Sequence, residues 1–523
     1  MKIFFGLLAG LIYSGVFAKP PNIIFFLTDD QRWNTLGEMG NPIIQTPEID
    51  ALSKQGVTFD NAYATTAICY ASRATIFTGQ HLSRNGMYAF SSTLSATALP
   101  LIYPRILRDS GGYYTGFIGK WGLGDQPASS FNKWWGFPGQ GTYEILTNGV
   151  VTGHLTPLMG DQALQFLDSA KASNKPFCLQ ISFKASHIQD GVPPYYIPDP
   201  ADMGLYVNDS IPSPPLTSPS FFNALPGFLK NPSTELRVRW VNEYSTPALF
   251  QQSLKNYYRL ISGADKVVGR VRNKLAALSM DTNTVLIFSS DHGYFIGDRG
   301  YSGKWLAYQV SSRVPLIIYD PRFSASQKGK HVRDFALNLD IPETILGLAG
   351  VKAPVIMQGR NLMGLINCTS NNWRSEFFFE HDYTPAAPSS KAVLTHRYSY
   401  IVYFRESPSY EELYDLQNDP DEAVNLIADT RYRAVRDSLR IRFQALQTSV
   451  ANDNVVQELQ TPSGCLTTKV EGAQVHPGKV GSPLRNSFLS GRKTFLSTGG
   501  RVYDGSGKRI ADPELEKKLF QGD

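Results

Sequence analysis

Four apolar runs, each followed by charged or imidazole side chains, are the feature of this sequence that most restricts its fold. Continuous apolar runs of this length are typical of parallel strands that helices cover on both faces. Because the carboxyl ends of parallel strands meet at one edge of a sheet, we expect the groups that follow them to converge there. The runs are residues 22–27, 114–118, 176–183 and 284–288, and the groups are Asp29, Asp30, Lys120, His187, Asp291 and His292.

Helical patterns separate these runs. Residues 161–172 and 253–278 carry apolar side chains at helical spacing, the second with an interruption near Gly263. This alternation predicts an α/β fold with a large, mostly parallel, doubly wound sheet flanked by helices. The chain is long enough for one large core or two domains.

The second half of the chain changes character. Residues 377–380, 398–404 and 412–416 are close in sequence and predict a smaller antiparallel sheet, and residues 431–449 predict an amphipathic helix. The predicted organisation is a signal peptide at 1–18, an α/β domain at 19–370, and a C-terminal subdomain at 371–523 with the small antiparallel sheet, the helix and a tail.

The first residues have the pattern of a secretory signal peptide. Lys2 precedes an apolar run over residues 3–17, and the small residue Ala18 follows it. The alternative is a first buried strand or an anchor, but the run is short for a helix that spans a bilayer. We therefore expect a periplasmic or secreted protein with no membrane span after the signal is removed.

Charge and cysteine content restrict the function classes. The formal charge of +5 is spread over 523 residues without a Lys/Arg block, so no nucleic-acid partner is expected, whereas an anionic substrate is compatible with it. Four cysteines, Cys69, Cys178, Cys368 and Cys465, are too few for a disulfide framework in a chain of this length. If Cys69 is modified, the other three allow at most one internal disulfide.

Cys69 lies immediately before a predicted helix start, and Ser72 and Arg73 follow it at three and four residues. A thiol in that position would feel the positive end of the helix and the arginine, which makes it reactive and attractive to anions. The alternative is a half-buried structural cysteine. In the same way, Asp29 and Asp30 are either cation ligands at a strand end or the acidic first turn of a helix.

A proline-rich segment over residues 190–246 directly follows His187. A long segment beside strand ends is usually either a loop that shapes the substrate site or a surface excursion. Its place after His187 favours the first interpretation.

The segment Cys69-Tyr-Ala-Ser-Arg73, followed by Thr78-Gly79, resembles the signature of the type I, formylglycine-dependent sulfatases of the alkaline phosphatase-like superfamily. Further segments resemble that family in the same order along residues 22–426. They are Asn22-Ile-Ile with Asp29-Asp30, Gly119-Lys-Trp, Pro176-Phe with His187, Ser290-Asp-His-Gly, Gly303-Lys, Arg313-Val-Pro-Leu-Ile, and Tyr414-Asp-Leu through Asn425-Leu.

In this family a maturation enzyme oxidises the cysteine of the motif to formylglycine, and Ala71 resembles the variant read by bacterial radical-type enzymes. The resemblance implies that Cys69 is modified in this way and that Arg73 holds the formylglycine hydrate. It implies that Lys120, His187 and Lys304 contact the sulfate or the leaving oxygen, with His187 as general acid. It also implies a Ca²⁺ site, whose ligands would be Asp29, Asp30, Asp291, His292 and the modified side chain of Cys69.

A hydrated aldehyde suits sulfate-ester hydrolysis. One hydroxyl attacks sulfur, and the second hydroxyl on the same carbon lets the enzyme expel sulfate and regenerate the aldehyde. One departure from the family pattern concerns that second step, because Gly122 stands where the family usually has a histidine that serves as base. The candidates for a replacement are His81, His154 and His381. After Gly303-Lys, residues 308–311 stand where the family more commonly has an acidic pair. This departure concerns the contacts with the substrate rather than the chemistry.

The sequence therefore predicts an exported, calcium-dependent sulfatase that acts on a sulfated carbohydrate or polysaccharide fragment. Two alternatives remain open. A phosphonate or phosphate-ester hydrolase of the same superfamily can share the fold and the nucleophile. A non-catalytic pseudosulfatase that binds sulfated glycans is motivated by Gly122.

Overall fold

A computed structural model describes residues 19–191, 193, 195–382, 386–464, 466–468, 496–498 and 501–503. The predicted signal peptide at 1–18, Cys465 and most of the tail lie outside the described residues. The chain divides into two compact units at residues 473 and 474. In the second unit, strands β22 (Leu496–Thr498) and β23 (Arg501–Tyr503) form an antiparallel pair.

A nine-stranded sheet forms the centre of the first unit. Strand β1 pairs in parallel with β9 on one side and β8 on the other, so that Ile24 lies beside both Leu286 and Leu179. Strands β12 and β21 run antiparallel to their neighbours, and the other pairs are parallel. From edge to edge the strands are β21 (Thr467–Thr468), β13 (Lys330–Val332), β2 (Val57–Phe59), β12 (Leu316–Tyr319), β9 (Thr284–Ser290), β1 (Asn22–Thr28), β8 (Phe177–Ser182), β4 (Tyr114–Lys120) and β5 (Lys133–Phe137).

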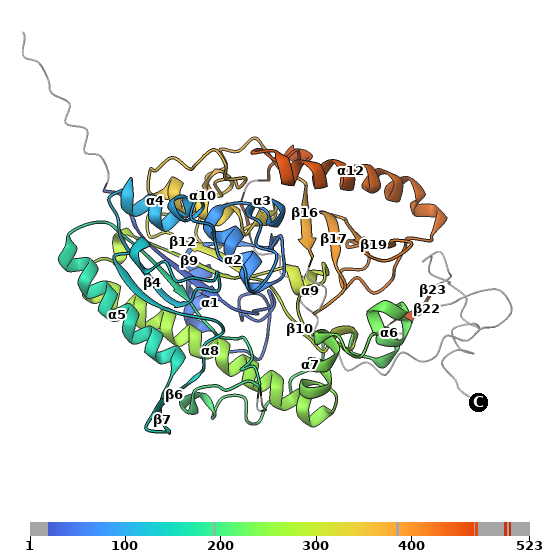
Figure 1. The fold of residues 1–523 in the computed structure, drawn as a ribbon, viewed down its shortest axis with the longest axis horizontal. Helices are drawn as coiled ribbons and strands as arrows, with labels where there is room; N and C mark the ends of the chain where they lie inside the picture. Colours follow the sequence, from blue (N-terminus) through green and yellow to red (C-terminus); the bar gives the residue numbers. More distant parts are fainter. Residues whose placement is uncertain are drawn as a thin grey trace, which may run out of the picture. The chain divides into compact units, whose positions relative to one another are not determined.

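The central sheet is buried on both faces, which explains its uninterrupted apolar runs. Along β1, Ile23, Phe25 and Leu27 belong to one core cluster, whereas Ile24 and Phe26 belong to another. Helices cover both faces (Figure 1), and the prediction of a mostly parallel, doubly wound sheet is confirmed. One face carries α1 (Pro47–Gln55), α5 (Leu155–Ser173) and α8 (Pro247–Ala277), and the other carries α2 (Cys69–Thr78), α4 (Tyr103–Asp109) and α10 (Asp340–Leu348).

The helix predicted over residues 253–278 is confirmed as α8, which runs for 31 residues. The interruption near Gly263 concerns the apolar pattern and not the helix itself. A β-carbon at Gly263 would lie 3.1 Å from Oδ2 of Asp202, so the glycine lets a neighbouring segment approach the helix closely. Helix α5 begins earlier than predicted, where the His154 side chain accepts a hydrogen bond from the Thr156 amide.

The segment at 190–246 contains short helices and is less irregular than its proline content suggests. They are η3 (Pro200–Asp202), α6 (Pro219–Ala224), η4 (Gly227–Lys230) and α7 (Glu235–Glu243). Proline occupies an early position in η3 and α6, where its missing N–H costs no hydrogen bond.

The predicted small antiparallel sheet is present, with one strand that was not predicted. Its order is β16 (Glu376–His381), β17 (Ser390–Thr395), β18 (Tyr398–Tyr403) and β19 (Tyr410–Asp415), of which β17 is the addition. One face packs on α12 (Arg433–Asn452), as Phe378 does with Phe443. The other face, including Phe377, belongs to the same core cluster as the central sheet. The predicted domain boundary at 370 and 371 stays a prediction.

The remaining elements are short. Paired strands are β3 (Ala62–Tyr63) with β14 (Ala336–Leu337), β6 (Glu144–Thr147) with β7 (Val150–His154), β10 (Phe295–Ile296) with β11 (Ser302–Gly303), and β15 (Asn372–Arg374) with β20 (Gln460–Pro462). Helical turns are α3 (Leu82–Asn85), η1 (Leu99–Leu101), η2 (Ala128–Ser130), η5 (Asp281–Asn283), η6 (Asp298–Gly300), α9 (Gln309–Ser312), α11 (Met363–Ile366) and η7 (Thr430–Tyr432). Among the described residues, no helix combines the length and apolar character needed to cross a membrane.

Candidate active site and metal centre

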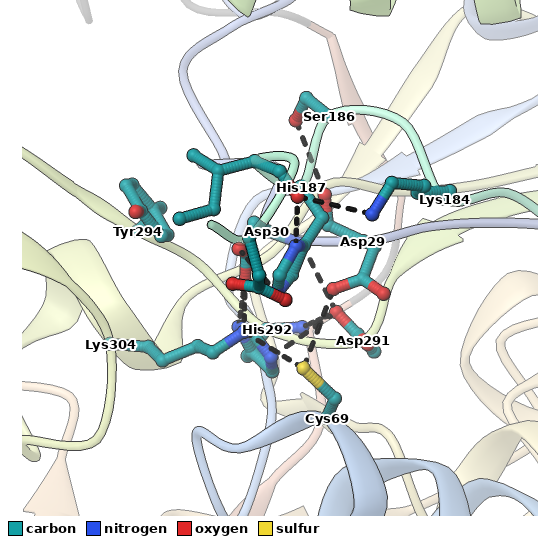
Figure 2. A network of polar contacts seen from close by, with 12 residues as sticks. Asp29, Asp30, Cys69, Lys184, Ser186, His187, Asp291, His292, Tyr294 and Lys304 are labelled. Atoms are coloured by element: carbon teal, nitrogen blue, oxygen red, sulfur yellow. Dashed lines mark hydrogen bonds and ion pairs between the residues drawn. The ribbon is translucent and has the colours of Figure 1, made fainter. Parts of the chain in front are cut away.

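The groups predicted to converge do meet at the carboxyl edge of the central sheet. Asp29 and Asp30 follow β1, and Asp291 and His292 follow β9, its parallel neighbour. Cys69 is the first residue of α2, and all five side chains are at most 1% exposed. Figure 2 shows Cys69 at the end of its helix with the carboxylates and His292 grouped around it.

Cys69 lies among charged groups. Its Sγ is 2.8 Å from Nζ of Lys304 and 3.5 Å from Oδ1 of Asp29, and it also lies at the positive end of α2. Cys178, the second residue of β8, provides a contrast, because burial raises the pKa of that thiol. The surroundings of Cys69 match those of a reactive thiol rather than an inert structural one.

Arg73 links two carboxylates of the site. Its Nε donates to Oδ2 of Asp291 at 3.0 Å, its Nη2 donates to Oδ2 of Asp29 at 2.9 Å, and its Nη1 donates to Oγ of Ser182 at 2.6 Å. The side chain is fully buried, and although burial opposes its charge, Asp291 and Asp29 outweigh that effect and raise the pKa of the guanidinium. Its predicted contact with a formylglycine hydrate stays a prediction.

Two predicted site lysines are buried and paired with the aspartates. Nζ of Lys120 is 2.5 Å from Oδ2 of Asp29, and Nζ of Lys304 is 2.6 Å from Oδ1 of Asp30. Burial works against the charge of Lys304, yet Asp30 and the other anions raise its pKa. Buried lysines need such partners, so these two are not ordinary surface cations.

His187 completes the predicted set. Its Nδ1 is 2.7 Å from the carbonyl oxygen of Ile188, and because a carbonyl only accepts, Nδ1 carries the hydrogen of that bond. Its Nε2 is 3.6 Å from Oδ2 of Asp30 and is the nitrogen left to gain or release a proton. Burial, together with Lys304 and Lys120, holds the pKa of the imidazole well below its usual range.

Four side chains are grouped as a cation site would require. One ligand atom each from Asp29, Asp30, Cys69 and His292 lies within 4.8 Å of the others. Oδ2 of Asp30 and Nε2 of His292 are buried and have no hydrogen-bond partner in the described part of the chain. Buried polar atoms are normally satisfied, so these two atoms fit a bound ion.

The fifth predicted ligand, Asp291, lies beside this group rather than in it. Its Oδ1 accepts from the amides of Asp30 and His292 and is 3.4 Å from Nε2 of His292, and its Oδ2 is bound by Arg73. Carboxylate oxygens suit calcium, whereas a thiol does not. The site therefore fits Ca²⁺ best if the side chain at Cys69 presents oxygen, as formylglycine does.

The electrostatics of the two neighbouring aspartates differ. Burial tends to raise the pKa of Asp29, but Lys120 and Arg73 outweigh it and hold that pKa well below the usual range. Burial dominates at Asp30 and raises its pKa despite Lys304. The pKa values of these two sequence neighbours are therefore shifted in opposite directions.

Lys184 is a site residue that the sequence interpretation missed. It follows β8, its Nζ donates to the Ile188 carbonyl at 3.1 Å, and it lies 5.0 Å from the ring centre of Tyr143. Burial, with Lys120 nearby, lowers its pKa to about 8. Its position directly after the apolar run at 176–183 was the available signal, of the same kind as the run before Asp29.

Gly122 has a positive φ of 74°, and a β-carbon there would lie 3.1 Å from Cδ of Arg73. Three histidines were considered as replacements for the usual base. His154, at the start of α5, already forms hydrogen bonds with the Thr156 amide and the Ile197 carbonyl. Burial, with Arg374 nearby, lowers the pKa of His81 to about 3. His381 lies in β16 opposite Ser390. The identity of the base stays open.

A hollow of about 130 Å³ adjoins His187 and Lys304. Three of its other lining residues come from the segment at 190–246, and they are Asp190, Glu235 and Arg239. This placement favours the substrate-shaping interpretation of that segment over a surface excursion.

Comparison with known proteins agrees with this geometry. A family model described as Sulfatase matches residues 21–351, and one described as N-sulphoglucosamine sulphohydrolase, C-terminal, matches residues 297–449. The N-acetylglucosamine-6-O-sulfatase of Bacteroides thetaiotaomicron is 28% identical over 85% of this chain and 89% of its own length.

Two solved structures show the same fold. One, a protein in complex with its substrate D-glucosamine-2-N,6-O-disulfate, has a TM-score of 0.72 and 25% identity and covers 83% of this chain and 99% of its own. The other, the phosphonate monoester hydrolase of Agrobacterium radiobacter, has a TM-score of 0.67 and 21% identity and covers 84% of this chain and 97% of its own. The second likeness concerns the fold alone.

Proposed function

This chain belongs to the sulfatase family, and we propose that it is an exported, calcium-dependent enzyme that removes sulfate esters from a sulfated carbohydrate by means of a formylglycine made from Cys69. Sulfate-ester hydrolysis is the activity of the family and of its named relatives. The observation that carries the proposal is the position of Cys69, at the start of α2 and within hydrogen-bond distance of Lys304. It lies beside ligand atoms of Asp30 and His292 that have no hydrogen-bond partner among the described residues.

A sulfated amino sugar, free or within a polysaccharide fragment, is the proposed substrate class. By their names, one relative is an N-acetylglucosamine-6-O-sulfatase and one solved relative holds its substrate D-glucosamine-2-N,6-O-disulfate. The pattern of residues 1–18 supports export, and the maturation enzyme is the partner that oxidation of Cys69 would require.

The residues of the chain divide the chemical work. Formylglycine would supply the nucleophile as a hydrated aldehyde, and calcium would supply positive charge for its ionisation and for the sulfuryl oxygens. Asp29, Asp30 and His292 would hold the ion, and Arg73 keeps Asp29 in place. Lys120 and Lys304 are buried cations that can bind sulfuryl oxygens and stabilise charge in the transition state.

His187 is the proposed general acid. Its Nδ1 is fixed by the Ile188 carbonyl, so Nε2 is the position from which a proton can reach the departing alcohol oxygen. The lysines that lower its pKa would be partly neutralised by an arriving sulfate. Substrate binding itself is therefore expected to bring His187 closer to its protonated form.

Two other functions have specific support. A phosphonate or phosphate-ester hydrolase is favoured by the fold shared with the phosphonate monoester hydrolase. A glycan-binding pseudosulfatase is favoured by Gly122, because its backbone φ of 74° suits glycine rather than the histidine usual in the family.

The test combines mass measurement with turnover. The protein is made alongside a maturation enzyme, the tryptic peptide that spans Cys69 is weighed, and release of sulfate from sulfated oligosaccharides is compared with hydrolysis of phosphate and phosphonate esters. We expect an aldehyde at residue 69, sulfate release that a calcium chelator abolishes, and none from Cys69→Ala. An unmodified thiol after competent co-expression would contradict the formylglycine mechanism, and aldehyde without turnover would leave only the binding role.

A further inference from the structure

Lys184 and His187 share one hydrogen-bond acceptor. Nζ of Lys184 is 3.1 Å from the carbonyl oxygen of Ile188, and Nδ1 of His187 is 2.7 Å from the same oxygen (Figure 2). A carbonyl oxygen has two lone pairs, so it can accept from both groups at once. The oxygen that anchors Nδ1 of His187 is therefore itself held by the side chain of Lys184.

The partners of Lys184 differ from those of the other two buried lysines of the site. Lys120 and Lys304 each lie against an aspartate, whereas no carboxylate oxygen lies within 4.0 Å of Nζ of Lys184 in the part of the chain that the structure describes. Lys184 is only 1% exposed, and burying an ammonium group without a close counter-ion is costly. The Ile188 carbonyl and the ring of Tyr143 are the contacts that hold it. This pattern points to a role in the turn around His187 rather than in an ion pair.

The turn that contains His187 is tied at several points. The amide of His187 donates to the Lys184 carbonyl at 2.8 Å. The hydroxyl of Tyr143, which is fully buried, lies 2.6 Å from the carbonyl oxygen of His187 and 3.2 Å from that of Lys184. The bond from Nζ of Lys184 to Ile188 then closes the turn on the far side of the histidine. The backbone is thus fixed both before and after His187.

Resting on the function proposed above, in which His187 is the general acid, we propose that Lys184 is a positioning residue for His187. Its amine holds the Ile188 carbonyl, the carbonyl holds Nδ1, and Nε2 is thereby kept directed at the leaving oxygen of the ester. One proton passes from Nε2 to that oxygen as its bond to sulfur breaks, and the sugar leaves as a neutral alcohol. Lys184 acts through His187 and needs no contact with the substrate.

The test compares two sulfate esters that differ in their need for a proton. The alcohol oxygen of N-acetylglucosamine 6-sulfate needs one when it leaves, whereas 4-nitrophenolate leaves as a stable anion. We expect Lys184→Met to lower kcat for the sugar ester by about tenfold or more, part of the roughly 10²–10⁴-fold that a positioned general acid supplies. The kcat for 4-nitrophenyl sulfate and the KM for both esters should change little. An equal loss of kcat for both esters would show a merely structural role and overturn the proposal.

Two further variants complete the comparison. Tyr143→Phe keeps the ring but removes the hydroxyl that binds the turn, so it should also lower kcat for the sugar ester selectively, and it tests the same turn if Lys184→Met does not fold. Lys171→Met is the matched control, because it removes a bond from a lysine to the Leu278 carbonyl outside the site. The ratio of the two kcat values should stay unchanged in this control. A ratio that shifts as much in the control as in Lys184→Met would overturn the proposal.

A double variant tests whether Lys184 acts through His187. In a His187→Asn background the general acid is already absent, so Lys184→Met should cause no further loss of kcat for the sugar ester. A further loss equal to that seen in the wild-type background would mean that Lys184 acts independently of His187, and the proposal would be wrong.

Crystal structures of the wild type and of Lys184→Met separate this proposal from the proposed function. Nε2 of His187 lies 3.6 Å from Oδ2 of Asp30 when Lys184 is present. We expect the imidazole of the variant to leave this position or to occupy several, and an unchanged imidazole would overturn the proposal. If the imidazole moves but the wild type releases no sulfate from either ester, the positioning role stands and the sulfatase function fails. If the wild type releases sulfate and Lys184→Met leaves both kcat values unchanged, the sulfatase function stands and the positioning role is wrong.

Discussion

At the scale of single residues, the site consists of buried charges that depend on one another. Asp29 is bound by Arg73 and Lys120, and Asp30 is bound by Lys304. Charges in such a position cost several kcal/mol to bury unless each has a partner. Loss of one member therefore affects its neighbours as well as the reaction.

Substitution Arg73→Met tests this dependence. Asp29 and Asp291 would lose a shared cation, so we expect the free energy of unfolding to fall by about 3–5 kcal/mol, the usual cost of breaking a buried pair. Added calcium should recover part of this loss, because the ion neutralises Asp29. Urea unfolding with and without calcium measures both effects. Arg440→Gln, which removes an exposed pair with Glu411, is the control and should cost less than about 1 kcal/mol.

Gly122 provides a second prediction at this scale. Gly122→Ala would place a β-carbon at a positive φ and 3.1 Å from Cδ of Arg73. We expect a loss of stability of about 1 kcal/mol from the backbone and a further loss of kcat from displacement of Arg73. Gly139→Ala is the control. Gly139 also has a positive φ, 59°, but a β-carbon there would have no atom within 4 Å. Equal loss of kcat in the two variants would show that the contact with Arg73 is unimportant.

The sequence identified site residues where a local pattern marks the strand end. Asp29 and Asp291 each follow an uninterrupted apolar run, so their convergence follows from parallel pairing of β1 and β9. Arg73, in contrast, was assigned to the formylglycine hydrate, and its bonds to Asp29 and Asp291 depend on a tertiary contact between α2 and the sheet. Lys184 also follows an apolar run, but that run was interpreted as leading to His187, and the burial of the lysine is a property of the folded chain.

At the scale of elements, the central sheet carries a titratable contact near one edge. His331 in β13 has its Nδ1 2.7 Å from Oδ1 of Asp60 and its Nε2 3.5 Å from Oε1 of Glu38. Burial opposes the charged imidazole, but the two carboxylates outweigh it and raise the pKa of His331 to about 9. The protonated histidine thus holds β13 to Asp60, which directly follows β2, and to Glu38 in the loop between β1 and α1.

The pH dependence of this contact has a definite sign. Folding raises the pKa of His331, so its protonated form stabilises the folded state. This contribution to the free energy of unfolding is complete below the unfolded pKa of about 6.5 and is lost as the pH rises through about 9. We expect His331→Gln to lower the free energy of unfolding by about 1–2 kcal/mol at pH 6, allowing for solvent screening, and by much less at pH 10. Urea unfolding of both proteins at the two pH values measures the difference, and a cost independent of pH would contradict the ionic role.

Elements with strong apolar patterns were predicted well, and those whose form depends on contacts were not. Strands β1, β4, β8 and β9 follow from their sequences because burial on both faces requires continuous apolar runs. The close approach of Asp202 to Gly263 in α8 could not be foreseen, since it is a contact between segments far apart in the sequence. Strand β17 was missed because residues 390–395 include serine, lysine and threonine and are specified by pairing with β16 and β18.

At the scale of the molecule, the small sheet is part of the main core rather than an addition to it. Its face containing Phe377, Phe379 and Leu394 belongs to the cluster that also contains Phe25 of β1. The amide of Glu380 donates to the Thr65 carbonyl, which precedes α2 and Cys69 by a few residues. The packing of this sheet therefore supports the segment that positions the nucleophile.

Two truncations test this integration. A chain that ends at residue 473 keeps the whole first compact unit, so we expect an unchanged melting temperature and unchanged sulfate release. A chain that ends at residue 370 would expose Phe377's partners in the main core, including Tyr63 and Phe335, and we expect it to be insoluble or to lack cooperative unfolding. Soluble yield, thermal unfolding and activity are compared for the two. A folded, active chain ending at 370 would mean that residues 19–370 form an independent domain, and the shared core would then contribute little to holding Cys69 in place.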